Sequence, residues 1–294
     1  MTLARTMLSY YELTKPKVVA LIVFTAVVGM FLSTPGMVPW DALVYGTLGI
    51  GLAASSAAVI NHILDRQVDA KMARTRGRPL PTGSLQLWPS LVFALALGAT
   101  AMAMLALLVN PLTAWLTLLS LIGYAVIYTV YLKRATPQNI VIGGAAGAAP
   151  PVLGWTAVTG ELHGHALLLF LIIFVWTPPH FWALAIARKD EYAAVDIPML
   201  PVTHGNEFTR LHILLYTILL LPISILPWVT GMSGIVYLLG ALGLGSVFLY
   251  YALALRRRPT DALAMKTFGY SITYLLGLFT FLLADHYLPP VFTL

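Results

Sequence analysis

The sequence predicts an all-α protein that crosses a membrane many times. Of its 294 residues, 59% are hydrophobic and only 10% are charged, whereas a soluble domain carries about 25% charged residues. The apolar residues form runs that are long enough to cross a bilayer, which takes about 20 residues in a helix. The connections between these runs are too short to hold a further folded domain. We therefore expect one transmembrane domain over residues 1–294.

Nine apolar runs qualify as spans, and short connections make successive spans antiparallel neighbours. The two narrowest boundaries lie at residues 110–111 and 230–233, so a miscounted hairpin would give seven or eleven spans. The first run is long enough to remain as a helix rather than serve as a cleaved signal. The expected spans are 18–33, 42–64, 88–109, 112–132, 140–159, 166–187, 211–230, 234–255 and 268–286.

The basic residues orient these spans in the membrane. With the N-terminus in the cytoplasm, the cytoplasmic segments contain all 17 Lys and Arg residues. The opposite side carries only acids and histidines, which are Asp41, Glu161, Asp285, His163, His165 and His286. This bias predicts a multi-pass protein of the inner (plasma) membrane with its C-terminus outside the cytoplasm. It also accounts for the net charge of +6, so we expect the lipid bilayer and no nucleic acid as a partner.

A polar stretch at 61–83 interrupts this apolar pattern. Asn61, Asp65 and Asp69 share one helix face because they are four residues apart. Acidic residues do not set orientation, and each costs about 2.5–3.5 kcal/mol deep in a membrane helix, so these two need a partner. Their oxygens suit Mg²⁺, which binds through one or two carboxylates plus substrate phosphates. The alternative is ion pairing in a solvated loop with nearby Arg66, Lys71 and Arg74.

A second acidic cluster follows the sixth span on the same side of the membrane. It contains Asp190, Glu191 and Asp196. The two clusters would bind opposite ends of one diphosphate through separate Mg²⁺ ions. Asp190 and Asp196 would lie on different faces of a continuous helix, whereas Tyr192 and Asp196 would share one. The prolines that follow limit this helix, so we expect a helix end that turns into a loop. Which carboxylates bind metal stays open.

These residues carry a family resemblance. The pattern N-x3-D-x3-D followed by RTRGRPLPTG, together with the second acidic loop, resembles the UbiA superfamily of intramembrane prenyltransferases. Three blocks resemble the haem-farnesylating branch of that superfamily. They are ELTKPKV near the N-terminus, YLKRATPQNIVIGGAAGAAPPVLGW at 131–155 and WTPPHFWALAIARKDEYAAVDIPMLPVTHG at 176–205. The last three spans match only in hydropathy and position.

The resemblance implies nine helices around a central cavity, capped by the acidic motifs. It implies that farnesyl diphosphate binds through Mg²⁺ and that the vinyl group of haem B, a substrate rather than a cofactor, attacks the farnesyl C1. Addition of water would give haem O, and contact with a downstream haem-modifying enzyme stays open. The implied metal ligands are Asn61, Asp65, Asp69, Asp190 and Asp196. The implied substrate-binding residues also include Lys71, Arg74, Arg78, Lys133, Arg134, Tyr192 and His180.

His180 follows two prolines inside the sixth span. It would ligate the haem iron or orient a propionate, or it would be a hydrogen-bonded packing histidine beside Trp182. His62 and His204 are weaker candidates for haem contact. The proline pairs at 150–151 and 178–179 predict kinks, and the small residues at 143–149 predict close helix packing. Trp155, Trp176 and Trp182 would flank a porphyrin or belong to an aromatic belt.

Two rival functions belong to other classes. A transporter usually shows inverted repeats or broken helices at the midplane. We find no repeat, and the polar residues gather at one face rather than lining a full path. A sister prenyltransferase that acts on an aromatic quinone precursor such as hydroxybenzoate would share both acidic motifs. Only the blocks TPPHFW and YLKRATPQN separate it from the haem enzyme. The sequence therefore favours a Mg²⁺-dependent prenyltransferase whose site opens to one membrane face.

Overall fold

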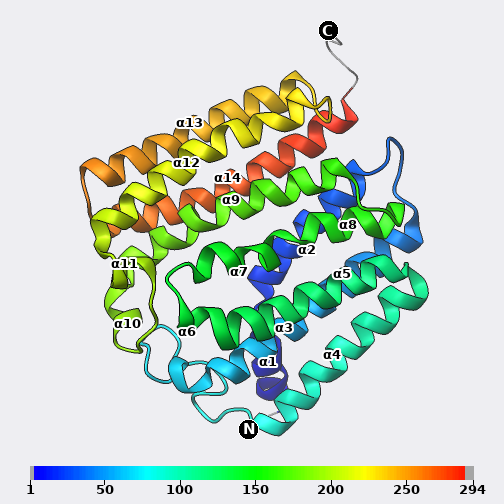
Figure 1. Ribbon diagram of the computed structural model, residues 1–294. Helices are drawn as coiled ribbons and strands as arrows, with labels where there is room; N and C mark the ends of the chain where they lie inside the picture. Colours follow the sequence, from blue (N-terminus) through cyan, green and yellow to red (C-terminus); the bar gives the residue numbers. More distant parts are fainter. Residues whose placement is uncertain (1–2, 289–294) are drawn as a thin grey trace.

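The computed structural model describes residues 3–288, and within that range it contains helices and no strands (Figure 1). Two stretches, η1 and η2, have the wider turn of a π-helix. In chain order the helices are α1 (Leu3–Leu13), α2 (Pro16–Leu32), η1 (Ala42–Gly46), α3 (Thr47–Asp69), α4 (Leu87–Leu108), α5 (Pro111–Ile122), η2 (Gly123–Leu132), α6 (Lys133–Ala135), α7 (Asn139–Ala148), α8 (Pro150–Thr159), α9 (Gly164–Ala187), α10 (Lys189–Ala193), α11 (Leu200–Thr203), α12 (Gly205–Val229), α13 (Ile235–Arg257) and α14 (Asp261–Tyr287).

The helices confirm the polytopic membrane fold. Eight helical segments within the described range are long and apolar enough to span a bilayer, and α1 with α2 makes a ninth if this pair, bent by 50°, counts as one span. Both narrow boundaries are confirmed, because α4 ends before Asn110 and α12 ends before Thr230. The eight spanning segments are Ala42–Asp69, Leu87–Leu108, Pro111–Ala135, Asn139–Thr159, Gly164–Ala187, Gly205–Val229, Ile235–Arg257 and Asp261–Tyr287.

Local sequence signals place several helix ends. Asn110 caps α5 by accepting the backbone N–H of Thr113 at 2.9 Å, as an N-cap asparagine commonly does. Gly160 ends α8 with a left-handed φ of 69°, a conformation that glycine adopts without steric cost. The prolines at 150–151 interrupt the fifth span between α7 and α8, as expected. The prolines at 178–179, by contrast, lie inside α9 without breaking it.

Helix α9 lies centrally and packs against α7, α8, α12 and α14. Small residues bring neighbouring backbones together, as membrane helices require for close packing. A Cβ at Gly154 in α8 would overlap the carbonyl oxygen of Ala26 in α2, and one at Gly143 in α7 would overlap the Tyr128 ring. Gly147 faces open space. The expected close packing is therefore present at Gly143 but not at every small residue of that run.

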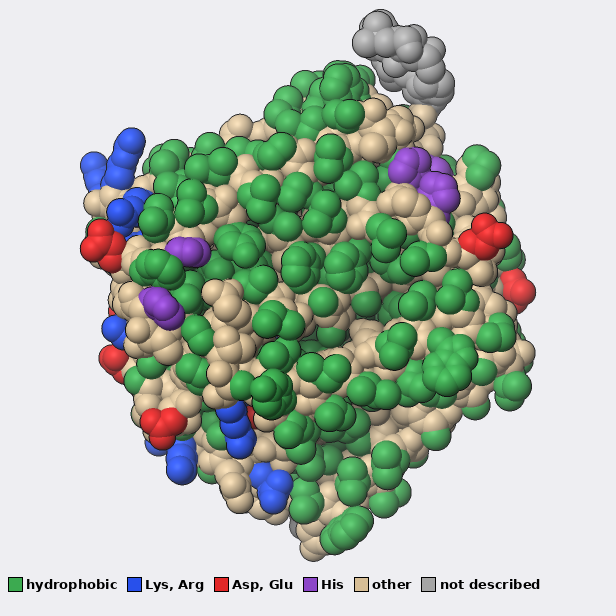
Figure 2. Space-filling model, viewed as in Figure 1, with side chains coloured by type: hydrophobic (Ala, Val, Ile, Leu, Met, Phe, Trp, Pro, Cys, Tyr) green, Lys and Arg blue, Asp and Glu red, His purple; other side chains and the backbone are tan. Residues whose placement is uncertain are grey.

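Charge gathers at one end of the bundle. We call it the basic end, and it is where α3, α6, α9 and α13 finish and α1 lies (Figure 1). Figure 2 shows Lys and Arg side chains along the left of the view, while apolar side chains cover most of the face between the two ends. This distribution agrees with a bilayer that surrounds the middle of the molecule.

Candidate functional site

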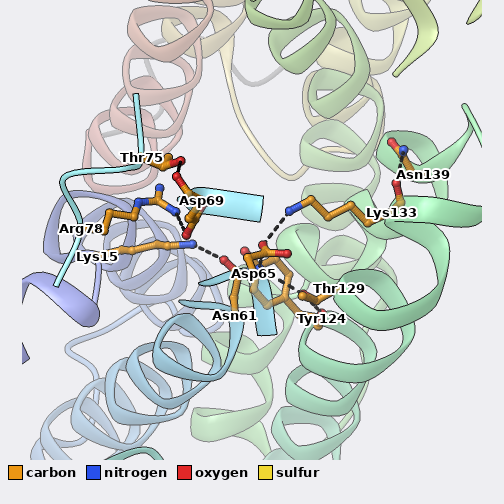
Figure 3. Close-up of polar contacts among 10 residues, drawn as sticks. All are labelled: Lys15, Asn61, Asp65, Asp69, Thr75, Arg78, Tyr124, Thr129, Lys133 and Asn139. Atoms are coloured by element: carbon orange, nitrogen blue, oxygen red, sulfur yellow. Dashed lines mark hydrogen bonds and ion pairs between the residues drawn. The ribbon is translucent and has the colours of Figure 1, made fainter. Parts of the chain in front are cut away.

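The first acidic motif lies in the last turns of α3, at the basic end (Figure 3). Its three side chains share one helix face, as the spacing predicts. Asn61, Asp65 and Asp69 are only 5%, 3% and 4% exposed. The Asn61 Nδ2 donates a hydrogen bond to the Asp65 Oδ2 at 2.9 Å. The motif is thus a buried polar row rather than a solvated surface.

Each residue of the motif is held by a cation from a different part of the chain (Figure 3). Lys133 forms an ion pair with Asp65 at 2.6 Å, and Arg78 forms one with Asp69 at 2.7 Å. Neither carboxylate pairs with Arg66, Lys71 or Arg74, and both are buried, so the alternative of ion pairing with these three residues in a solvated loop is wrong. Arg66 instead donates to the backbone carbonyl of Ile63.

Lys15 is a member of this site that sequence reasoning missed. Its Nζ donates to the Asn61 Oδ1 at 2.6 Å. It lies in the bend between α1 and α2, with a left-handed φ of 51°, directly before the proline that starts α2. Burial, with Arg78 nearby, lowers the pKa of Lys15 to about 7. An anion bound here would favour the charged ammonium. The only sequence signal was its place in the ELTKPKV block.

The π-helical stretch η2 supplies the opposite wall of the site. The Thr129 hydroxyl accepts from the Asn61 Nδ2 at 3.2 Å and donates to the Tyr124 carbonyl at 2.9 Å. The Tyr124 and Tyr128 rings stack with centroids 5.6 Å apart. Helix α6 follows directly and begins with Lys133. π-helical turns are rare in proteins, and those that occur are often at functional sites. The presence of η2 therefore supports a functional site here.

These residues fit a divalent cation. The Asp65 Oδ1 is buried and has no hydrogen-bond partner within residues 3–288, although buried carboxylate oxygens are normally satisfied. Two carboxylates and a carboxamide are oxygen ligands of the kind that Mg²⁺ prefers. No three His, Asp or Glu side chains of the described chain lie close enough together to hold a metal. Substrate phosphates would therefore complete the coordination, as is common for Mg²⁺.

The second acidic motif is more open. Asp190 lies in the short α10, and Asp196 lies in the loop after it with a left-handed φ of 54°. This is the expected helix end turning into a loop, so Tyr192 and Asp196 do not share a continuous helix. Both aspartates are exposed, and Glu191 pairs with Arg188 at 3.0 Å. Beside them is a cavity of about 330 Å³ whose lining includes no residue of the first motif.

The loops that carry the two motifs pack against each other at the basic end. Arg74 lies in the loop after α3, and its guanidinium acts electrostatically on the Tyr192 hydroxyl. Burial raises the pKa of Tyr192, and the Arg74 guanidinium opposes this shift. Met72, in the same loop, belongs to an apolar cluster that also contains Tyr192 and Ile197. The two motif loops are therefore neighbours, although their carboxylates do not form one cluster.

The remaining predicted residues lie in different surroundings. The His180 Nδ1 is bonded to the Ser271 hydroxyl at 2.6 Å, and its ring stacks on Trp176 and Phe268 at 4.2 and 4.6 Å. These contacts match the packing alternative, with Trp176 rather than Trp182 beside the ring, and the predicted haem contact stays a prediction. Lys71, Arg134 and His204 are exposed.

Comparison with known proteins agrees with this geometry. The model of the UbiA prenyltransferase family matches residues 22–283. A protein of Nitrosococcus oceani named "Protoheme IX farnesyltransferase" is 64% identical over 280 residues, which cover 95% of this chain and 94% of that protein. A protein of the same name from Methylococcus capsulatus is 65% identical with the same coverage.

Solved structures share the fold at low sequence identity. A digeranylgeranylglyceryl phosphate synthase superposes with a TM-score of 0.80 at 18% identity, over 96% of this chain and 98% of that one. A UbiA homolog from Archaeoglobus fulgidus, bound to DMAPP and Mg²⁺, superposes with a TM-score of 0.66 at 17% identity, over 93% and 99% of the two chains. Fold, motif geometry and family match thus agree, and the chain belongs to the UbiA prenyltransferase family.

Proposed function

We propose that the protein transfers the farnesyl group of farnesyl diphosphate to a vinyl group of haem B, with addition of water, to give haem O and diphosphate. The observation that carries this proposal is the similarity to relatives named "Protoheme IX farnesyltransferase", which are 64% and 65% identical over nearly their whole length. The buried carboxylates beside three cations support an anionic, metal-bound substrate. The name shared by these relatives favours haem over a quinone precursor such as hydroxybenzoate as the prenyl acceptor.

The chain's own residues hold the diphosphate in this proposal. Mg²⁺, when bound, neutralises charge that develops on the leaving group. The first motif would hold one metal ion through Asp65 and Asp69, with the Asn61 oxygen available once Lys15 turns to the diphosphate. Lys15, Arg78 and Lys133 would donate to diphosphate oxygens, and such fixed donors stabilise the charge of the departing group. The second motif would contribute Asp190 and Asp196, and the exposed Lys71, Arg74 and Arg134 would attract the anion at the rim.

The reaction needs a dry interior. The bond between the farnesyl C1 and oxygen breaks, and its electron pair leaves with the diphosphate. The vinyl group then bonds to C1, water adds to the resulting cation, and a proton is lost to solvent. Apolar helix faces below the motifs exclude water from the allylic cation. His180 has its Nδ1 bonded to Ser271, so it would offer only Nε2 to a haem.

An assay with purified protein tests this function. Incubation with haem B, farnesyl diphosphate and Mg²⁺ should give haem O, identified by its mass, and chelation of Mg²⁺ should abolish the product. A parallel incubation replaces haem B with hydroxybenzoate and should give no prenylated product. Prenylated hydroxybenzoate without haem O would transfer the function to the quinone branch of the family.

We also propose that the basic end and the N-terminus face the cytoplasm, because all 17 Lys and Arg residues lie in the segments expected there. The chain has no native cysteine, so single cysteines report topology directly. In intact cells, Glu161→Cys should react with a membrane-impermeant maleimide, whereas Arg76→Cys should react only after permeabilisation. Both positions are exposed. The reverse pattern would overturn the proposed orientation.

A further inference from the structure

His62 is a buried polar residue that the mechanism above does not use. It follows Asn61 in α3 and is 2% exposed. Neither Nδ1 nor Nε2 has a hydrogen-bond partner among the described residues. Buried polar atoms are nearly always paired, and each exception needs an explanation. An imidazole with two unpaired nitrogens lowers the stability of the ligand-free protein, since both atoms have lost their water.

The position of His62 relates it to the candidate site. It precedes Asp65 by three residues and Asp69 by seven, so the three side chains follow one helix face. At a rise of 1.5 Å per residue, His62 lies about 4.5 Å deeper than Asp65 and about 10.5 Å deeper than Asp69 along α3. The charged groups that act on it are Lys15 and Arg78, which bind Asn61 and Asp69. The imidazole is therefore at the inner side of the cationic site.

The neighbours of His62 restrict what its partner can be. Arg78 and the charged form of Lys15 are hydrogen-bond donors only, so neither can accept the imidazole N–H. In the proposed function, a bound diphosphate would offer several anionic oxygens, and its prenyl-bearing end would point toward the apolar interior, where His62 lies. A ring nitrogen left with an exposed lone pair beside an allylic cation would also trap that cation. The site therefore works best if the N–H of this imidazole is directed at the anion.

We propose that His62 is a positioning residue that donates an N–H hydrogen bond to the bound diphosphate and so gains the partner that it lacks without ligand. This inference rests on the proposed function, because it takes a prenyl diphosphate as the ligand. A purely structural histidine would already have its partners in the folded chain.

The experiment compares two variants in two measurements. Affinity for farnesyl thiodiphosphate, a slowly reacting analogue, is measured by calorimetry with Mg²⁺, and the unfolding temperature is measured without ligand. His62→Leu should weaken binding about tenfold or more, as expected for a lost hydrogen bond to a charged group. Its unfolding temperature should stay equal or rise, because an unpaired buried polar group is removed. His62→Asn keeps an N–H donor and should bind within about threefold of wild type.

Thr117→Val is the matched control. Thr117 is 2% exposed in α5, and its hydroxyl also has no partner in the described chain, so its removal should leave the affinity unchanged. Wild-type affinity in His62→Leu would overturn the inference, as would a lower unfolding temperature with unchanged affinity. Asp65→Asn separates the two proposals. If it too binds the analogue normally, the diphosphate site itself is wrong, whereas if it alone loses binding, only the role of His62 fails.

Discussion

Replacement of Asp65 by Asn is expected to lower Mg²⁺-dependent turnover about a thousandfold, since a metal ion that stabilises the leaving group contributes several kcal/mol and about 1.4 kcal/mol corresponds to a factor of ten. Asp65 should show the largest effect in the first motif because its Oδ1 is buried without a partner. The variant removes the negative charge but keeps the shape of the side chain. Steady-state rates over a Mg²⁺ titration measure the change.

The control for Asp65→Asn is Asp41→Asn. Asp41 is exposed at the opposite end of the bundle, so the turnover of the Asp41→Asn protein should match that of the wild type. Asp69→Asn tests the neighbouring carboxylate in the same assay. Each motif variant must elute like the wild-type protein and show an unfolding transition, because only the rate of a folded variant can be compared. Full Mg²⁺-dependent turnover by folded Asp65→Asn would remove this residue from the metal site.

Lys133→Met should lower the free energy of unfolding of the ligand-free protein by about 3–5 kcal/mol, because it breaks a buried ion pair and leaves one charge uncompensated. The Lys133 and Asp65 side chains in this pair are only 14% and 4% exposed. The double variant Lys133→Met with Asp65→Leu should recover most of this loss, since apolar residues in place of both charges remove the desolvation penalty. Denaturation in detergent, followed by circular dichroism, measures both effects.

Arg256→Met provides the comparison for an exposed pair. Arg256 pairs with Glu207 at 3.2 Å, with side chains 35% and 78% exposed, and such pairs contribute about 0–1 kcal/mol. If Lys133→Met is no more destabilising than Arg256→Met, Asp65 does not depend on Lys133 for its charge. A double variant that stays as unstable as Lys133→Met alone would point to lost packing instead.

The membrane fold could be predicted because hydropathy and helix period are local properties of the chain. The narrow boundary at Asn110 depends on a cap and a following proline, both visible in the sequence. The shared face of Asn61, Asp65 and Asp69 follows from their spacing alone. Acidic residues buried in a membrane helix need partners, and the structure pairs Asp65 with Lys133 and Asp69 with Arg78.

The partners themselves could not be predicted, because they depend on how distant segments pack. Lys15 is 46 residues before Asn61, and Lys133 is 68 residues after Asp65. Every basic residue already had an explanation in membrane topology, and this hid Lys15; only the family resemblance pointed to Arg78 and Lys133. The π-helical turn before Lys133 has no clear sequence signal. Arg66 is closer in sequence to both aspartates, but it donates to the backbone carbonyl of Ile63 instead.

The separation of Asp65 from Lys133 also bears on biogenesis. A ribosome adds about 5–20 residues per second, so the 68 residues between them take about 3–14 s to synthesise. During that interval α3 enters the translocation machinery while the Asp65 carboxylate has no permanent counter-ion. The nascent chain must keep this end of the helix in the wet interface until the π-helical span arrives. Insertion of that later span therefore completes the pairing of a helix made seconds before it.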